Sequence, residues 1–219
     1  MAQVTGTYSV YDAAGLREDL SDIIYSISPT ETPFMSGIGK EKATAVLHEW
    51  QTDSLASAVA TNAQIEGDEI GFSAPSATTR VNNRTQISRK SVIVTGTLDS
   101  VSKAGRNNEL AYQISKASKE LKRDMESSLC ANNSPVVGDD STARELAGLA
   151  GWIQQNNDAG TGGANGQVSN VDVPGTARTD GTQRAFTESQ LKSVIKKCWD
   201  EGGDPSMIML GSFNKQVLS

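Results

Sequence analysis

The chain has 219 residues and a formal net charge of −6 at pH 7, with a sequence pI near 4.9. This acidic balance argues against nucleic-acid binding through a broad basic face, because phosphate contacts need clustered Lys and Arg. Hydrophobic residues make up 37% and aromatic residues 5%, beside 20 glycines, which predicts a folded chain with less core than a compact enzyme. No apolar run is long enough for a membrane span, and the first ten residues do not resemble a signal peptide. We therefore expect the chain to be made and kept in the cytoplasm.

The chain is expected to begin with an extended arm. Residues 1–15 are polar and predicted to be extended, whereas residues 16–27 carry apolar side chains at helical spacing. The pair Ser28-Pro29 ends that helix, because the residue before proline disfavours the α region. Residues 30–39 are turn-rich, and three apolar side chains there predict a segment that anchors on another surface: Phe34, Met35 and Ile38.

A long β-hairpin is predicted next. Residues 43–53 and 78–98 both have the composition of strands, and residues 54–77 between them are small, polar and acidic. Loops of this length are usually functional or mobile, and a two-stranded ribbon is marginal by itself. We therefore expect the hairpin to extend from the body and to pack on an adjacent subunit.

Residues 108–131 give the strongest helix prediction of the chain. Apolar side chains recur at steps of three and four and form one stripe, and Asn107 or Asn108 can cap the start. At 1.5 Å per residue this helix is about 35 Å long, which suits a spine against which a sheet packs. The stripe side chains expected in the core are Leu110, Ile114, Leu121 and Met125.

The C-terminal third predicts smaller elements. Gly148 and Gly151 argue against a regular helix over residues 141–156, and residues 157–182 read as an exposed loop. Residues 187–201 predict a helix with Thr187 as cap and Gln190 three residues on. A short buried strand is expected over residues 206–210, and a further helix begins after it. Because these elements do not finish a sheet, we expect the natural protein to continue.

Residue types that carry chemistry are sparse. His48 is the sole histidine, and its place on a strand beside Trp50 favours a half-buried packing residue over a catalytic base. Cys130 and Cys198 show no metal-ligand spacing and are too few for a disulfide framework, so we expect buried or half-buried thiols. No phosphate-binding loop has its full pattern. The sequence therefore predicts no enzyme and no catalytic, cofactor or metal site.

Charges are distributed unevenly along the predicted hairpin. The tip is acidic, with Glu66, Asp68 and Glu69, and no Lys or Arg lies between Lys42 and Arg80. Tip-to-base contacts between copies would suit rings and shells, whereas ordinary solubility charge on an edge strand is the alternative. The basic residues on the returning strand are Arg80, Arg84, Arg89 and Lys90.

The order of these elements resembles the tailed-bacteriophage major capsid proteins of the Hong Kong ninety-seven type. The amino-acid sequence resembles the subfamily of these capsid proteins found in podoviruses with elongated heads. The matching segments are residues 21–40 (SDIIYSISPTETPFMSGIGK), 120–129 (ELKRDMESSL), 142–153 (TARELAGLAGWI) and 206–216 (SMIMLGSFNKQ). The resemblance implies an α+β fold with an N-terminal arm (1–42), an extended loop (43–97), a peripheral domain with the spine helix (98–140) and the start of an axial domain (141–219).

The resemblance also implies a function. Proteins of this fold self-assemble as hexamers and pentamers into a shell around double-stranded DNA, which they enclose without sequence-specific binding and without a membrane. Scaffold, portal and decoration proteins are the further partners it implies, in a virion assembled in the host bacterial cytoplasm. Two alternatives stay open: an encapsulin-like nanocompartment shell, and a phage decoration or adhesion module, which predicts a compact β-sandwich and no long helix.

Overall fold

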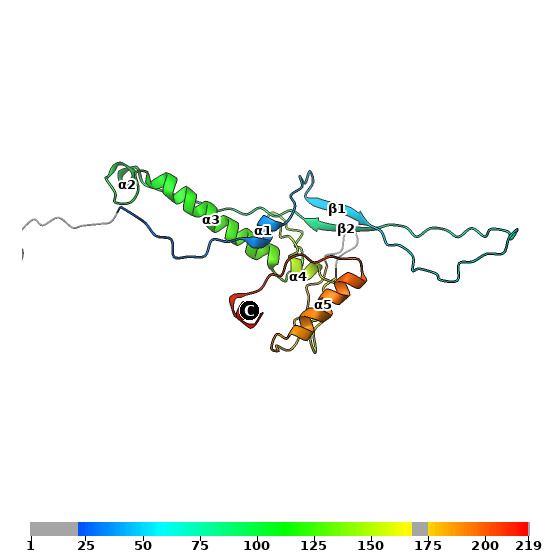
Figure 1. The fold of residues 1–219 in the computed structure, drawn as a ribbon. Coiled ribbons are helices and arrows are strands. Elements are labelled where there is room, and N and C mark those ends of the chain that lie inside the picture. Colours follow the sequence, from blue (N-terminus) through cyan, green and yellow to red (C-terminus); the bar gives the residue numbers. More distant parts are fainter. Residues whose placement is uncertain (1–21, 168–174, 219) are drawn as a thin grey trace, which may run out of the picture. The chain divides into compact units, whose positions relative to one another are not determined.

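The computed structural model describes residues 22–167 and 175–218, which form helices and one small sheet (Figure 1). This mixture agrees with the α+β class. The chain divides into two units, and each is described by itself: the first contains residues up to 30 together with 90–120, and the second contains 31–89 together with 121–219. The elements are α1 (Pro33–Gly37), β1 (Leu47–Thr52), β2 (Thr79–Arg84), α2 (Gly96–Ser100), α3 (Glu109–Cys130), α4 (Leu149–Trp152), α5 (Glu188–Asp200) and α6 (Ser212–Leu218).

In the first unit, residues 22–27 are not helical, so the helix expected over residues 16–27 is wrong for this part; residues 16–21 lie outside the described residues. The segment instead lies against a turn at Gly105, whose backbone N–H donates to Asp22 Oδ1 at 3.2 Å. Gly105 has a φ of +75°, and a Cβ there would stand 2.9 Å from Ile24 Cγ1. Short helices are marginal without a packed face. The contacts of Asp22 and Ile24 with the turn at Gly105 therefore hold residues 22–27 in a non-helical conformation.

The corner between α2 and α3 is held by side chains that bond to backbone. Lys103 Nζ donates to three carbonyl oxygens, at 2.7–3.0 Å, in and just after α2. Asn108 Oδ1 accepts from the N–H of Ala111 at 2.7 Å, which confirms Asn108 as a cap. Glu109 is 3% exposed. Hydrogen bonds from Gln113, and then from Arg106, hold the pKa of its carboxyl below the ordinary value.

Helix α3 has 22 residues and confirms the predicted helix over 108–131. Its apolar stripe is not fully covered: Leu121 is half-buried, and Ile114 has 52% of its surface exposed. Leu110 and Met125 are exposed as well. The described residues of one chain therefore do not bury the stripe, and its role as a core stays a prediction.

Strands β1 and β2 form an antiparallel pair that runs from Leu47 opposite Arg84 to Thr52 opposite Thr79 (Figure 1). The hairpin prediction is confirmed, but the second strand is shorter than expected. After Arg84, only the bond from Thr85 N to Val46 O continues the pairing among the described residues, and residues 96–100 are helical. A β-type composition forms a strand only where a neighbouring strand pairs with it.

The rest of the second unit is built from short elements and isolated bridges. Thr187 and Gln190 make the predicted capping box at the start of α5, with each side chain bonded to the other's backbone N–H. Residues 206–210 do not form a strand, and Met207 and Ile208 are exposed. The buried strand expected there is wrong for this structure, because none of the described residues supplies a strand beside it.

Polar side chains, and not apolar ones, are the most buried in the described part of the chain. None of the described hydrophobic side chains is fully withdrawn from solvent, whereas Thr32, Asn82 and Glu109 are buried. Apolar burial is the main driving force of folding, and the described residues leave many large apolar side chains exposed.

Candidate assembly surfaces

One carboxylate of α3, the predicted spine helix, binds the anchor segment (residues 30–39). The backbone N–H groups of Phe34 and Met35 donate to Glu126 Oε1 and Oε2, at 2.8 and 2.7 Å. These are orphan donors of the first turn of α1, and Thr32 before it makes no side-chain cap. Phe34 and Met35 are half-buried and Ile38 is exposed. Sequence reasoning selected the anchor segment but missed Glu126, because the two sites are 92 residues apart.

An aromatic stack lies at the base of the hairpin. Trp50 of β1 stacks on Trp152 of α4, with ring centroids 5.0 Å apart and planes at 25°. The ring of His48 lies 5.7 Å from that of Trp50, and His48 is half-buried, as its strand position predicted. The stack joins two segments that are separated by about a hundred residues.

Three asparagine side chains bond to backbone as if they were peptide groups. Asn83 accepts from Ala147 N at 2.9 Å and donates to Ala147 O at 3.2 Å. Asn133 donates to Leu146 O at 2.8 Å and accepts from Gly148 N at 3.1 Å. Asn132 donates to the carbonyl oxygen of Arg178 and accepts from its backbone N–H. No sequence signal pointed to this asparagine network, which ties the hairpin base and the end of α3 to later loops.

The predicted charge contacts are distributed over both units. Within the hairpin Arg80 pairs with Glu49 at 3.5 Å. The acidic residues lie in the exposed loop between the strands, where Asp68 Oδ1 accepts from the N–H of Glu69 at 2.9 Å. The tip-to-base contact between copies stays a prediction for all the candidates. Those in the second unit are Glu66, Asp68, Glu69, Arg80, Arg84 and Arg89, and Lys90 lies in the first.

The loop between β1 and β2 also exposes large apolar side chains. Leu55 is 99% exposed and Phe72 97% exposed, and Ile65 and Ile70 are similarly open. Sequence reasoning treated this loop as polar and acidic and gave these residues no role. A contiguous exposed apolar patch usually marks an interaction site, whereas single exposed apolar side chains are normal.

In the described part of the chain, the cysteines and the charged side chains form no metal-binding group. Cys130 is exposed at the last position of α3, so its expected burial is wrong, whereas Cys198 is half-buried as expected. Desolvation of the sulfur and the nearby Glu126 carboxylate raise the pKa of the Cys130 thiol. Within residues 22–167 and 175–218 there is no cluster of three His, Cys, Asp or Glu residues that could hold a metal ion. Over the same residues, no helix is long and apolar enough to cross a membrane.

Backbone docking, an aromatic stack and exposed apolar side chains are the features that the described residues present for contacts. Comparison with known proteins gives the chain a family. The family model described as SU10 major capsid protein matches residues 3–219. The chain is also 29% identical, over 237 aligned positions, to the major capsid protein of Escherichia phage Phieco32; the match covers 95% of this chain and 67% of that protein.

The chain therefore belongs to the SU10 major capsid protein family of bacteriophages. Members of this family are structural proteins of the virion capsid and not enzymes, as the sequence predicted.

Proposed function

We propose that the chain is the shell-forming subunit of a phage head, with a Hong Kong ninety-seven type fold, which assembles as hexamers and pentamers around double-stranded DNA. Among such proteins we assign it to those of podoviruses with elongated heads. The resemblance of the arm, hairpin, spine helix and C-terminal segments supports this proposal. We further propose the domain limits 1–42, 43–97, 98–140 and 141–219.

The observation that carries the proposal is the apolar surface of the hairpin loop. Leu55, Ile70 and Phe72 are covered by nothing in the described part of their own chain, and water contact of such side chains is unfavourable. A neighbouring copy can bury them. The loop between β1 and β2 is exposed over residues 53–79, so each copy offers a segment that a neighbouring copy can contact. Such heterologous contacts can close rings.

The uncovered stripe of α3 supports the same function. Ile114 and Met125 are exposed along a helix that is otherwise amphipathic. Loops of neighbouring copies are suitable occupants of such a stripe. The acidic tip and the basic hairpin base, in turn, favour one orientation of approach between copies.

Further partners follow from a capsid role. We propose that scaffold, portal and decoration proteins bind the shell and that assembly takes place in the host bacterial cytoplasm. The net charge of −6 suits a shell that encloses DNA without binding its phosphates through a broad basic face. The decoration-module alternative is not favoured, because the described residues contain a 22-residue helix and a two-stranded sheet in place of a compact sandwich.

Negative-stain microscopy of the purified protein tests the proposal. We expect capsomers or shells from the unchanged chain, and a monodisperse monomer would contradict it. The double variant Ile70→Asp with Phe72→Asp should keep the far-ultraviolet circular dichroism of the parent but lose assembly. Ser73→Asp, which places a charge in the same exposed loop without removing apolar surface, is the matched control and should still assemble.

The contents of assembled particles separate a phage head from an encapsulin-like shell. Particles from infected cells should contain nuclease-protected double-stranded DNA. Particles that contain only a protein cargo would contradict the phage-head proposal and favour the nanocompartment.

A further inference from the structure

The loop between β1 and β2 has a defined geometry at its base and at its tip. At the base, Thr52 of β1 pairs with Thr79 of β2. At the tip, Asp68 N donates to Ile65 O at 3.1 Å, and Gly67 has a φ of +85°. A type II turn needs a positive φ at its third residue, and glycine adopts it without strain. The chain therefore reverses its direction at this turn, as it does at the end of a hairpin.

The two arms between the base and the tip turn (residues 65–68) do not pair. The outgoing arm is residues 53–64 and the returning arm is residues 69–78, and every residue in them is exposed. The structure describes both arms, and no backbone hydrogen bond joins one to the other. A two-stranded ribbon is marginal in water unless a face of it is packed, which accounts for open arms in a single copy.

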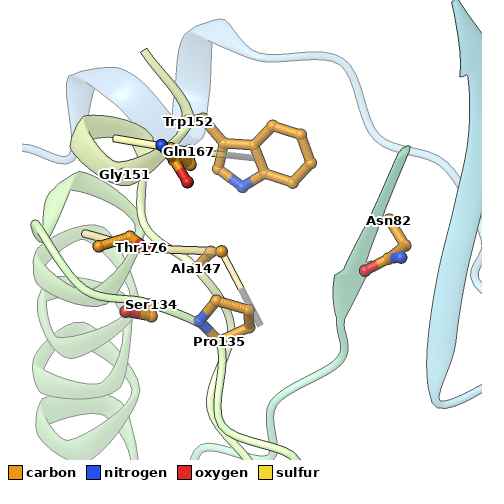
Figure 2. Close-up of a pocket in the computed structure, with 9 residues that line it drawn as sticks. Asn82, Ser134, Pro135, Ala147, Gly151, Trp152, Gln167 and Thr176 are labelled. Atoms are coloured by element: carbon orange, nitrogen blue, oxygen red, sulfur yellow. The ribbon is translucent and has the colours of Figure 1, made fainter. Parts of the chain in front are cut away.

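The base differs from the arms because it packs on the rest of its unit. Figure 2 shows Asn82 of β2 across a small cavity from Pro135 and Ala147. Trp50 of β1 stacks on Trp152. Pairing is therefore confined to the part of the hairpin that has a packed face.

The base and the tip turn impose registers that differ by two residues. The base register, continued outward, would place the chain reversal between Ile65 and Glu66. The tip turn instead brings Ile65 opposite Asp68. The outgoing arm is thus longer than the returning arm by two residues, and a bulge in the outgoing arm would take them up.

Pro75 indicates where this bulge lies. In the base register it would lie opposite Ala56, at a position where the ladder needs its N–H as a donor, and proline has none. In the tip register it lies opposite Ala58, at a position where the nitrogen points away from the partner strand. The register therefore changes at residues 56–57.

The tip register places the apolar side chains of both arms together. Because side chains alternate between faces, an offset of two residues leaves every side chain on its face, whereas an offset of one would not. The large apolar side chains of residues 58–75 all fall on one face of the closed arms: Val59, Ile65, Ile70 and Phe72. The other face carries polar side chains, among them Asn62, Gln64, Glu69 and Ser73. Closure of the arms thus gathers separately exposed side chains into one apolar patch, the kind of surface that marks an interaction site.

We propose that residues 58–64 and residues 69–75 close into an antiparallel strand pair in the register of the tip turn, with a bulge at residues 56–57. In the open arm Ala60 and Thr61 form a turn, which straightens on closure. The apolar face of the closed arms is the surface that a second copy covers, and this last step rests on the proposed shell. The pairing itself is a property of the single chain.

Disulfide trapping in the purified full chain tests the register. In a background with Cys130→Ser and Cys198→Ser, the double variant Ala60→Cys with Ser73→Cys occupies a non-hydrogen-bonded pair of the tip register, where side chains lie closest. Ala58→Cys with Ser73→Cys is the matched control, because these positions are opposite only in the base register. We expect the first pair to form its intramolecular disulfide severalfold faster than the control. Equal rates, a faster control, or no intramolecular disulfide in either variant would overturn the proposal.

The glycine of the tip turn gives a second test in the variant with cysteines at positions 60 and 73. Gly67→Ala strains the turn, because alanine avoids a φ of +85°, and should slow trapping about fivefold or more. Gly71→Ala is the control, since Gly71 has no positive φ and a Cβ there would meet no atom within 4 Å; its trapping rate should not change. Equal rates in the two alanine variants would show that the tip turn does not set the register. Neither test depends on assembly, so its outcome is separate from that of the shell proposal.

Discussion

Single side chains hold segments of this chain that are remote in sequence. Glu126 is the clearest case, because one carboxylate accepts from two backbone N–H groups at the start of α1. A carboxylate also suits the positive end of a helix. The anchor segment thus depends on a residue of the spine helix as well as on its own apolar side chains.

Replacing Glu126 by Ala should lower the free energy of unfolding by about 1–3 kcal/mol, because two hydrogen bonds to a charged group are lost. Denaturant unfolding measures this loss. Glu120→Ala on the same helix is the control: Glu120 only meets Lys116 at 3.9 Å on the exposed surface, and such pairs are worth about 0.3–0.5 kcal/mol. Equal losses in the two variants would show that Glu126 does not hold the anchor.

Asp139 gives a pH-dependent prediction at the same scale. The hydroxyl of Ser141, followed by the backbone N–H groups of Ser141 and Thr142, lowers the pKa of Asp139 from 3.8 to about 2. Because the folded pKa lies below the unfolded one, the stabilisation is present above pH 3.8 and is lost as the pH falls through about 2.

The stability difference between the parent and Asp139→Asn should therefore shrink over that acidic range, as followed by unfolding at a series of pH values. Asp140→Asn removes the same charge one residue further on and serves as the control. A carboxyl titration of Asp139 near 3.8, measured by nuclear magnetic resonance, would contradict the assignment.

At the scale of elements, local signals start and stop the helices. The capping box of Thr187 and Gln190 begins α5, and Thr187→Ala should cost about 1 kcal/mol because an N-cap hydrogen bond is lost. Urea unfolding provides the measurement. Ser193→Ala inside α5 should be neutral or slightly stabilising, since alanine has the higher helix propensity; a loss like that of Thr187→Ala would argue against a specific cap.

The apolar stripe of α3 is the element that we expect assembly to cover. Leu121 is half-buried in the described chain, so Leu121→Ala should cost the isolated subunit about 1 kcal/mol. If the stripe becomes core in the shell, the same change should cost about 2–5 kcal/mol per subunit there. A loss below about half a kcal/mol in both states would show that the stripe is not buried.

For the whole molecule, the distribution of lysines predicts how the proposed shell would be held together. Residues 43–79 contain no Lys, so the outer loop has no amine with which to form an isopeptide bond to a neighbour. We expect non-covalent contacts, chiefly hairpin charge pairs and arm docking. Exposed pairs contribute about 0–1 kcal/mol each, and many copies must act together.

Denaturing gel electrophoresis of assembled particles shows whether their subunits are joined covalently. After boiling with reductant we expect one monomer band, and particles treated with glutaraldehyde provide the control ladder. A ladder in untreated particles would refute the non-covalent shell.

The sequence alone determined the features that depend on neighbours along the chain. The periodic stripe predicted α3 almost to its ends, and Thr187 with Gln190 predicted the start of α5. Both signals are local, because helical hydrogen bonds join residues four apart. A phage major capsid protein could also be recognised from the order of the elements and from the amino-acid sequence of four segments, whereas the fold type and the subfamily stay proposals.

Only the tertiary structure decided which remote segments meet. Nothing near Glu126 in sequence indicates that it caps α1, and Trp50 gives no sign of Trp152. The strand expected over residues 206–210 and the continuation of β2 beyond Arg84 failed for the same reason. A helix satisfies its backbone groups within its own segment, whereas a strand or a docking side chain needs a partner that folding brings from elsewhere in the chain.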